Sequence, residues 1–249
     1  MALNKDSKVY TLAIALIICL VGSVLVSTAA VVLKPRQQAN QALDRQVNIL
    51  KVAGLYEPGI DVGAVFAERV EPQVIEFATG EVAEDIDPAS FDPAKYQQPL
   101  SNSEDIAGIN SQSRYGLVYL VRDDQGAVSR YVLPVHGYGL WSTMYAFLAL
   151  EADGNTVSSI SYYQQAETPG LGGEIENPRW TAQWDGKQIY GEDGKVAFTL
   201  VKGGASADNE FGVDALAGAT LTSNGVTNTI RFWLSDAGYK PFLENATRS

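Results

Sequence analysis

The chain has 249 residues, a formal net charge of −11 and a single cysteine. Its length allows one globular domain with an anchor, and its acidic balance disfavours binding to nucleic acid or to an anionic lipid surface. Because Cys19 lies in the apolar N-terminal run, the globular part can have neither a disulfide nor a thiolate metal site.

An uncharged apolar run, Tyr10–Leu33, follows a short N-terminal segment, residues 1–9. As a helix it is long enough to cross a hydrocarbon core of about 30 Å. The alternative is a cleaved signal peptide, but the run exceeds the apolar region of such peptides. We therefore predict a retained transmembrane helix over residues 10–33. Charge does not decide its orientation, because lysine or arginine flanks both ends.

Residues 34–113 are expected to be helical at first and then rich in loops. Residues 34–55 read as a helix whose apolar positions dock on the domain. A short helix near 62–70 and a strand near 73–77 follow. The Asp- and Pro-rich chain beyond them, up to Asp105, predicts long loops.

A second domain is expected over residues 114–249. The β-branched and aromatic runs 115–122 and 127–135 are separated by Asp123-Asp124-Gln125-Gly126, which is a hairpin signal. The runs 141–151 and 157–165 repeat the pattern, and a helix near 178–184, a strand near 196–201 and a C-terminal helix follow. This order predicts an α+β fold, with an antiparallel sheet and packed helices.

The stretch 212–225, GVDALAGATLTSNG, joins small residues and hydroxyls to the start of that helix. Thr222, Ser223 and Asn224 are residue types that cap a helix, which puts Thr220 one turn before the helix start. Free N–H groups and the helix dipole favour an anion there, above all a phosphate. The hypothesis is a phosphate-bearing ligand beside Thr220. The alternative is a turn that only leads into a capped helix.

The connection 134–141, PVHGYGLW, has two glycines around an aromatic residue and ends on Trp141. Glycines allow a close backbone approach, and Trp141 can lie against a flat ring. The alternative is a connection whose aromatic residues cover the core. His136, the single histidine, has no partners with the spacing of a triad or a zinc site. We therefore expect neither a catalytic residue nor a metal site.

The loop 166–174, AETPGLGGE, is rich in backbone N–H donors. Glu167 can accept hydrogen bonds from a ring or a ribityl group, while the loop offers N–H groups to a carbonyl or a phosphate. Lys202 can supply a positive charge to that phosphate. The alternatives are a glycine-rich surface loop and a solvated lysine. Neither a Rossmann nor a P-loop fingerprint is present.

Four motifs in order, behind one membrane helix, carry a family resemblance: PVHGYGLW, ETPGLGGEIENPRW, KGGA and VDALAGATLTSNGV. They resemble the C-type subunit of the Na⁺-translocating NADH:quinone reductase, over nearly the whole chain. The resemblance implies a flavoprotein subunit of a six-subunit bacterial reductase, with FMN joined through its phosphate to Thr220. This chain has Ala217 where the family has the serine of Ser-Gly-Ala-Thr.

The resemblance also implies a flavin transferase as partner, an anchor in the inner membrane, a cytoplasmic N-terminus and a periplasmic domain from about Lys34. Its FMN-binding domain is shared with the G-type subunit of the Rnf electron-transport complex, which is one alternative. The other is a membrane-anchored module that binds a small ligand without turnover. The candidate cofactor-binding residues are Thr220, Trp141, Glu167, Thr168, Gly170, Leu171, Lys202, Ala219 and Thr222.

Overall fold

The computed structural model describes residues 7–206 and 208–248. The chain divides into two compact units, Met1–Arg45 and Gln46–Ser249. One helix, α1 (Lys8–Val52), contains the apolar run and continues past Pro35. It is long and apolar enough to cross a membrane, and its most apolar window is not buried. The second helix predicted from residue 34 is therefore the continuation of α1, and the proline costs one intrahelical hydrogen bond without ending it.

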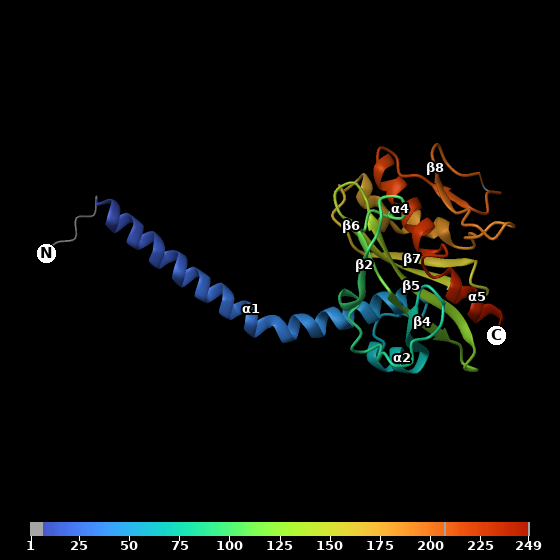
Figure 1. The fold of residues 1–249 in the computed structure, drawn as a ribbon, viewed down its shortest axis with the longest axis horizontal. Coiled ribbons are helices and arrows are strands. Elements are labelled where there is room, and N and C mark those ends of the chain that lie inside the picture. The colour runs from blue at the N-terminus through green and yellow to red at the C-terminus, as the bar shows by residue number, and fades with distance from the viewer. Residues whose placement is uncertain (1–6, 207, 249) are drawn as a thin grey trace. The chain divides into compact units, whose positions relative to one another are not determined.

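The second unit is built on a five-stranded antiparallel sheet, which confirms the predicted fold class (Figure 1). Its order is β1-β4-β5-β6-β7, with bounds Val70–Glu76, Tyr115–Arg122, Val128–Tyr138, Thr143–Glu151 and Val157–Gln164. A short helix, α2 (Val62–Arg69), leads directly into β1. β1 pairs with β4 along its whole length, so the sheet contains residues from both sides of the domain boundary expected near residue 113.

Shorter elements fill the connections. A 3₁₀ turn (Pro93–Tyr96) and an antiparallel pair, β2 (Gln97–Pro99) with β3 (Ser111–Ser113), lie within the segment predicted as loops. The helix predicted near 178–184 is α3 (Pro178–Thr181) between two 3₁₀ turns, Gly172–Glu176 and Ala182–Trp184. The remaining elements are β8 (Thr199–Val201) parallel to β9 (Gly212–Asp214), α4 (Thr220–Trp233) and α5 (Lys240–Arg248).

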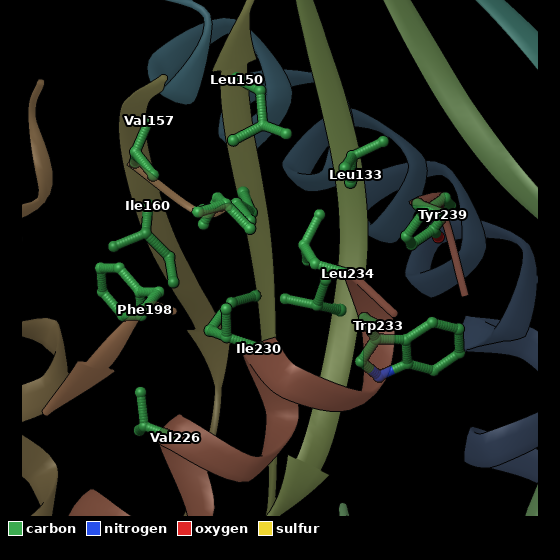
Figure 2. Packing of buried hydrophobic residues seen from close by; sticks show 14 of the residues in the cluster. Leu133, Leu150, Val157, Ile160, Phe198, Val226, Ile230, Trp233, Leu234 and Tyr239 are labelled. Carbon is green, nitrogen blue, oxygen red and sulfur yellow. The ribbon is translucent and has the colours of Figure 1, made fainter. Parts of the chain in front are cut away.

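Both faces of the sheet are buried. Side chains alternate between faces along a strand, so Leu148 and Leu150 of β6 join one cluster while Phe147 and Ala149 join another. The first cluster includes Ile230 of α4 and Leu234, the residue that follows this helix, and Figure 2 shows both among side chains of the sheet. The second includes the last residues of α1, among them Ile49 and Leu50. Each such fully buried aliphatic side chain contributes about 1.5–3 kcal/mol.

Glycines set the distance between α4 and the end of β5. A Cβ atom at Gly225 of α4 would collide with the carbonyl oxygen of Tyr138, and one at Gly137 would collide with the hydroxyl of Thr229. Only residues without side chains allow this approach. The first turn of α4 is thereby placed beside the connection that leads from β5 to β6.

Candidate functional site

The first turn of α4 differs from the sequence prediction. The helix begins at Thr220, its N-cap residue is Ala219, and no side chain in the described chain caps it. Thr222, Ser223 and Asn224 are therefore not the cap. The Ser223 hydroxyl donates to the Ala219 carbonyl and accepts from the Leu216 N–H, both at 3.0 Å, and so braces the preceding turn. The N–H groups of the first turn remain available to an anion.

Thr220 and Lys202 line one cleft of about 450 Å³. Its walls are the chain after β8, the turn between β9 and α4, and the first turn of α4: Leu200, Lys202, Gly203, Gly204, Asp214, Ala215, Leu216, Ala217, Gly218, Thr220, Ser223 and Asn224. Both Thr220 and Lys202 are exposed. The structure thus places an exposed hydroxyl, a lysine and a helix N-terminus at one cleft, and their binding of a phosphate stays a prediction.

The chain after Lys202 is shaped by two glycines. Gly203 and Gly204 have φ values of 87° and 100°, in the region that favours glycine. Asp214 Oδ1 then accepts a 2.8 Å hydrogen bond from the N–H of Ala205, which fixes the returning chain against β9. This backbone geometry fixes the segment that follows β8, which places Lys202 at the cleft.

The oxygens of Glu167 are hydrogen-bonded to the protein, whereas the sequence prediction gave them to a ring or a ribityl group. Glu167 is 4% exposed, and its oxygens already accept hydrogen bonds from the N–H groups of Leu140, Trp141 and Ser142 and from the hydroxyl of Thr222. Burial raises the pKa of this carboxyl, but the hydrogen bonds from Thr222 and from the three N–H groups outweigh that effect and lower the pKa below its usual value. Glu167 is thus an ionised group bound by the protein itself.

Two glycines around Glu167 make this arrangement possible. A Cβ atom at Gly139 would lie 2.6 Å from Glu167 Oε1, and one at Gly172 would lie 2.6 Å from Thr222 Oγ1. The sequence prediction assigned the glycines of these loops to the approach of a ligand. At positions 139 and 172 the missing side chain instead leaves room for the Glu167 carboxylate and the Thr222 hydroxyl.

Three large apolar side chains remain exposed around this first turn. Trp141 is 65% exposed, Leu171 43% and Leu221 56%. A Cβ atom at Gly218 would lie 3.0 Å from Leu171 Cδ2, so Leu171 reaches the turn that precedes Thr220. Leu221 was not among the residues predicted from the sequence, although its position between two threonines of the same turn was a usable signal. Grouped exposed apolar side chains indicate a binding surface.

The remaining predicted residues shape the backbone. The Thr168 carbonyl accepts hydrogen bonds from the N–H groups of Leu171 (3.1 Å) and Gly173 (3.0 Å), while its side chain is exposed. Gly170 is exposed with a φ of 76°, and a Cβ atom there would have no heavy atom within 4 Å. Ala219 is 6% exposed at the N-cap. Their contribution to a ligand site stays a prediction.

His136 lies in an aromatic stack. Its ring stacks on Tyr145, with centroids 5.4 Å apart, and packs against Trp233 at 4.9 Å. Burial lowers the pKa of His136 to about 4. Within residues 7–206 and 208–248, no three His, Cys, Asp or Glu side chains are grouped in a way that could hold a metal ion.

Comparison with known proteins connects this site to a family. Residues 139–235, which contain Trp141, Glu167, Lys202 and Thr220, match the FMN-binding domain. The C-type subunit of the Na⁺-translocating NADH-quinone reductase of Vibrio parahaemolyticus is 49% identical over 253 residues, covering 98% of this chain and 97% of the relative. The corresponding subunit from Yersinia pestis is 47% identical, covering 97% and 94%.

Solved structures agree with the sequence relatives. NqrC from Shewanella oneidensis superimposes with a TM-score of 0.76 at 35% identity, covering 84% of this chain and 98% of that one. The C-type subunit from Parabacteroides distasonis gives a TM-score of 0.67 at 27% identity, covering 85% and 96%. With nearly half of its residues identical to those of its relatives along almost its whole length, this chain belongs to the NqrC family, the C-type subunits of the Na⁺-translocating NADH-quinone reductases.

Proposed function

We propose that this chain carries FMN, joined through its phosphate to the hydroxyl of Thr220, and relays electrons within a sodium-translocating NADH-quinone reductase. The observation that carries the proposal is the position of Thr220, which is exposed on the uncapped first turn of α4 and shares a cleft with Lys202. The names of the relatives favour an NqrC subunit over the Rnf alternative and over a module without redox function.

The residues of the cleft fit a phosphodiester. Such a group keeps one negative charge, which the N–H groups and the dipole of α4 stabilise together with Lys202. Thr222 lies only two residues further on, but its hydroxyl is bonded to Glu167 and its side chain is 1% exposed. Thr220 is therefore the threonine of this turn that a flavin transferase can reach.

The exposed apolar side chains fit the flat ring of the same cofactor. Trp141, Leu171 and Leu221 surround the first turn of α4 and offer the apolar and aromatic contacts that a ring system requires. When bound, FMN supplies the redox chemistry itself. The protein's part is to hold the phosphate, orient the ring and keep the site at a fixed place in the assembly.

The proposal extends to partners and orientation. The flavin transferase and the other subunits of a six-subunit reductase are the expected partners. α1 crosses the inner membrane once, with the second unit in the periplasm. Protease added to intact spheroplasts should digest that unit. Protection in spheroplasts, with digestion only in inverted vesicles, would reverse the orientation.

Mass spectrometry tests the proposal directly. The full chain, produced together with a flavin transferase, should have an intact mass increased by one esterified FMN. Peptide mapping should place the adduct on Thr220. An unmodified mass, or an adduct on Thr222, would refute the assignment of the attachment residue.

A further inference from the structure

One buried carboxylate joins three separate parts of the site. Glu167 belongs to the loop that follows β7, and its Oε1 accepts hydrogen bonds from the N–H groups of Trp141 (2.9 Å) and Ser142 (3.1 Å). The Leu140 N–H lies 3.1 Å from each carboxylate oxygen. Oε2 accepts a 2.6 Å hydrogen bond from the hydroxyl of Thr222 in α4. The loop, the β5–β6 connection and the first turn of α4 therefore converge on Glu167.

These partners use the hydrogen-bonding capacity of the carboxylate. An ionised carboxylate offers about four acceptor positions. Three N–H groups and the Thr222 hydroxyl occupy them, the Ser142 hydroxyl lies 3.5 Å from Oε1, and the residue is 4% exposed. The backbone of Gly139 and Gly172 closes the remaining space. A flavin could reach these oxygens only if protein partners were released.

The connection that carries Trp141 is held by hydrogen bonds more than by packing. The Gly139 N–H donates to the Ser142 carbonyl at 2.8 Å, and the Ser142 hydroxyl accepts from the Ala166 N–H at 2.8 Å. The Trp141 side chain is 65% exposed and that of Leu140 is 39% exposed, so packing contributes little to their positions. In addition, three consecutive N–H groups of this connection, those of Leu140, Trp141 and Ser142, share the Glu167 carboxylate as acceptor. Removing the carboxylate would leave these three N–H groups without their acceptor, and the connection would lose the contacts that fix residues 140–142.

We propose that Glu167 is a positioning residue for the flavin, which acts through the backbone of residues 140–142 and holds Trp141 beside the first turn of α4 without touching the flavin. This inference rests on the proposed function, because Trp141 is taken to lie against the flavin ring. It differs from the expectation that Glu167 binds the cofactor directly.

The first experiment needs no flavin. Hydrogen exchange is measured on the full Thr220→Ala chain in detergent, with and without a change at Glu167. Glu167→Ala should remove the protection of the Leu140, Trp141 and Ser142 amides. Glu167→Gln should keep it, because its amide oxygen can accept the same N–H groups and its NH₂ can donate to Thr222. Full protection in Glu167→Ala, or its loss in Glu167→Gln, would overturn the proposal.

The second experiment uses the chain with covalent flavin. An indole against the ring quenches flavin emission, so Trp141→Ala should raise that emission. Glu167→Ala should raise it to the same level, and the double variant should show no further increase. If the two single effects add in the double variant, Glu167 acts on the flavin itself and the proposal is wrong.

Controls separate local from global effects. Glu174 lies in the same loop, and its carboxylate accepts a hydrogen bond from the side chain of Asn177. Glu174→Gln should leave both amide protection and flavin emission unchanged. If Glu167→Ala does not fold, Glu167→Asp replaces it, since the shorter side chain keeps the charge but cannot span the same donors. A wild-type chain without covalent flavin would refute the proposed function, while the exchange experiment would still test the role of Glu167.

Discussion

Thr220 and Thr222 lie two residues apart in the first turn of α4 and face opposite environments. Thr220 is exposed on the cleft, whereas Thr222 is 1% exposed and donates its hydroxyl proton to Glu167. A step of two residues along a helix corresponds to a rotation of about 200°, which puts Thr220 and Thr222 on opposite sides of the helix. One hydroxyl is consequently available for modification, and the other is part of the core.

Replacing Thr222 tests its place in the core. Thr222→Val keeps the shape of the side chain but removes the hydrogen bond to the buried carboxylate. The free energy of unfolding should fall by about 1.5–3 kcal/mol, as for hydrogen bonds to charged groups. Urea denaturation measures the change, and covalent flavin should be retained. Thr220→Val, on the exposed side of the turn, is the control and should stay within about 0.5 kcal/mol of the wild type.

Replacing Thr220 tests the attachment point. Thr220→Ala should give a folded chain without covalent flavin, since the nucleophilic hydroxyl is absent and no buried contact is lost. Thr220→Ser restores a hydroxyl at the same position and should carry flavin again. Flavin fluorescence after a denaturing gel reports both results. A fluorescent Thr220→Ala band would locate the attachment elsewhere.

Gly170→Val tests whether the 166–174 loop borders the flavin. The φ of 76° should make valine cost about 1–2 kcal/mol of stability, although no heavy atom lies within 4 Å of the new Cβ. Gly186→Val is a matched control, because Gly186 has a φ of 75° and equally open surroundings. Both variants should lose similar stability in urea. Only Gly170→Val should alter flavin occupancy or the visible spectrum, and two identical spectra would remove the loop from the site.

Lys202→Met tests the charge at the cleft. Lys202 lines the cleft with Thr220, so its loss should slow flavin transfer to the chain by about three- to tenfold, within the range of one exposed charge-assisted hydrogen bond. The initial rate of adduct formation is followed by intact mass. Lys195→Met, which removes a lysine paired with Asp193 instead, should leave the rate unchanged. Equal rates in all three chains would mean that Lys202 does not assist the phosphate.

His136 predicts a pH dependence of stability. Burial lowers its pKa from 6.5 to about 4, so between these values the unfolded chain binds a proton that the folded chain does not. The stability is fully present above pH 6.5 and falls as the pH drops towards 4, by up to about 1.4 kcal/mol per pH unit. In His136→Phe, urea midpoints should fall less steeply across this window. An unchanged slope would assign the acid sensitivity to other groups.

Local sequence patterns were enough to predict the long apolar helix and the hairpin strands, and they also led to the hypothesis that Thr220 and Lys202 bind a phosphate. An uncharged run, alternating β-branched residues and a turn between strands are each visible within a few neighbouring positions. Thr220 and Lys202 were selected in this way, since a helix start and the end of a strand are also local signals. Both residues line one cleft, and their contact with a phosphate stays a prediction.

Contacts between distant segments set what each polar side chain does. The Thr222 hydroxyl bonds to a carboxylate 55 residues away instead of capping its own helix, and Glu167 takes N–H groups from a connection more than 20 residues earlier. Neither of these hydrogen bonds can be predicted from a periodicity or a residue spacing in the sequence. Both follow from burial, because a carboxylate removed from water must be surrounded by donors, and only the folded chain brings those donors to it.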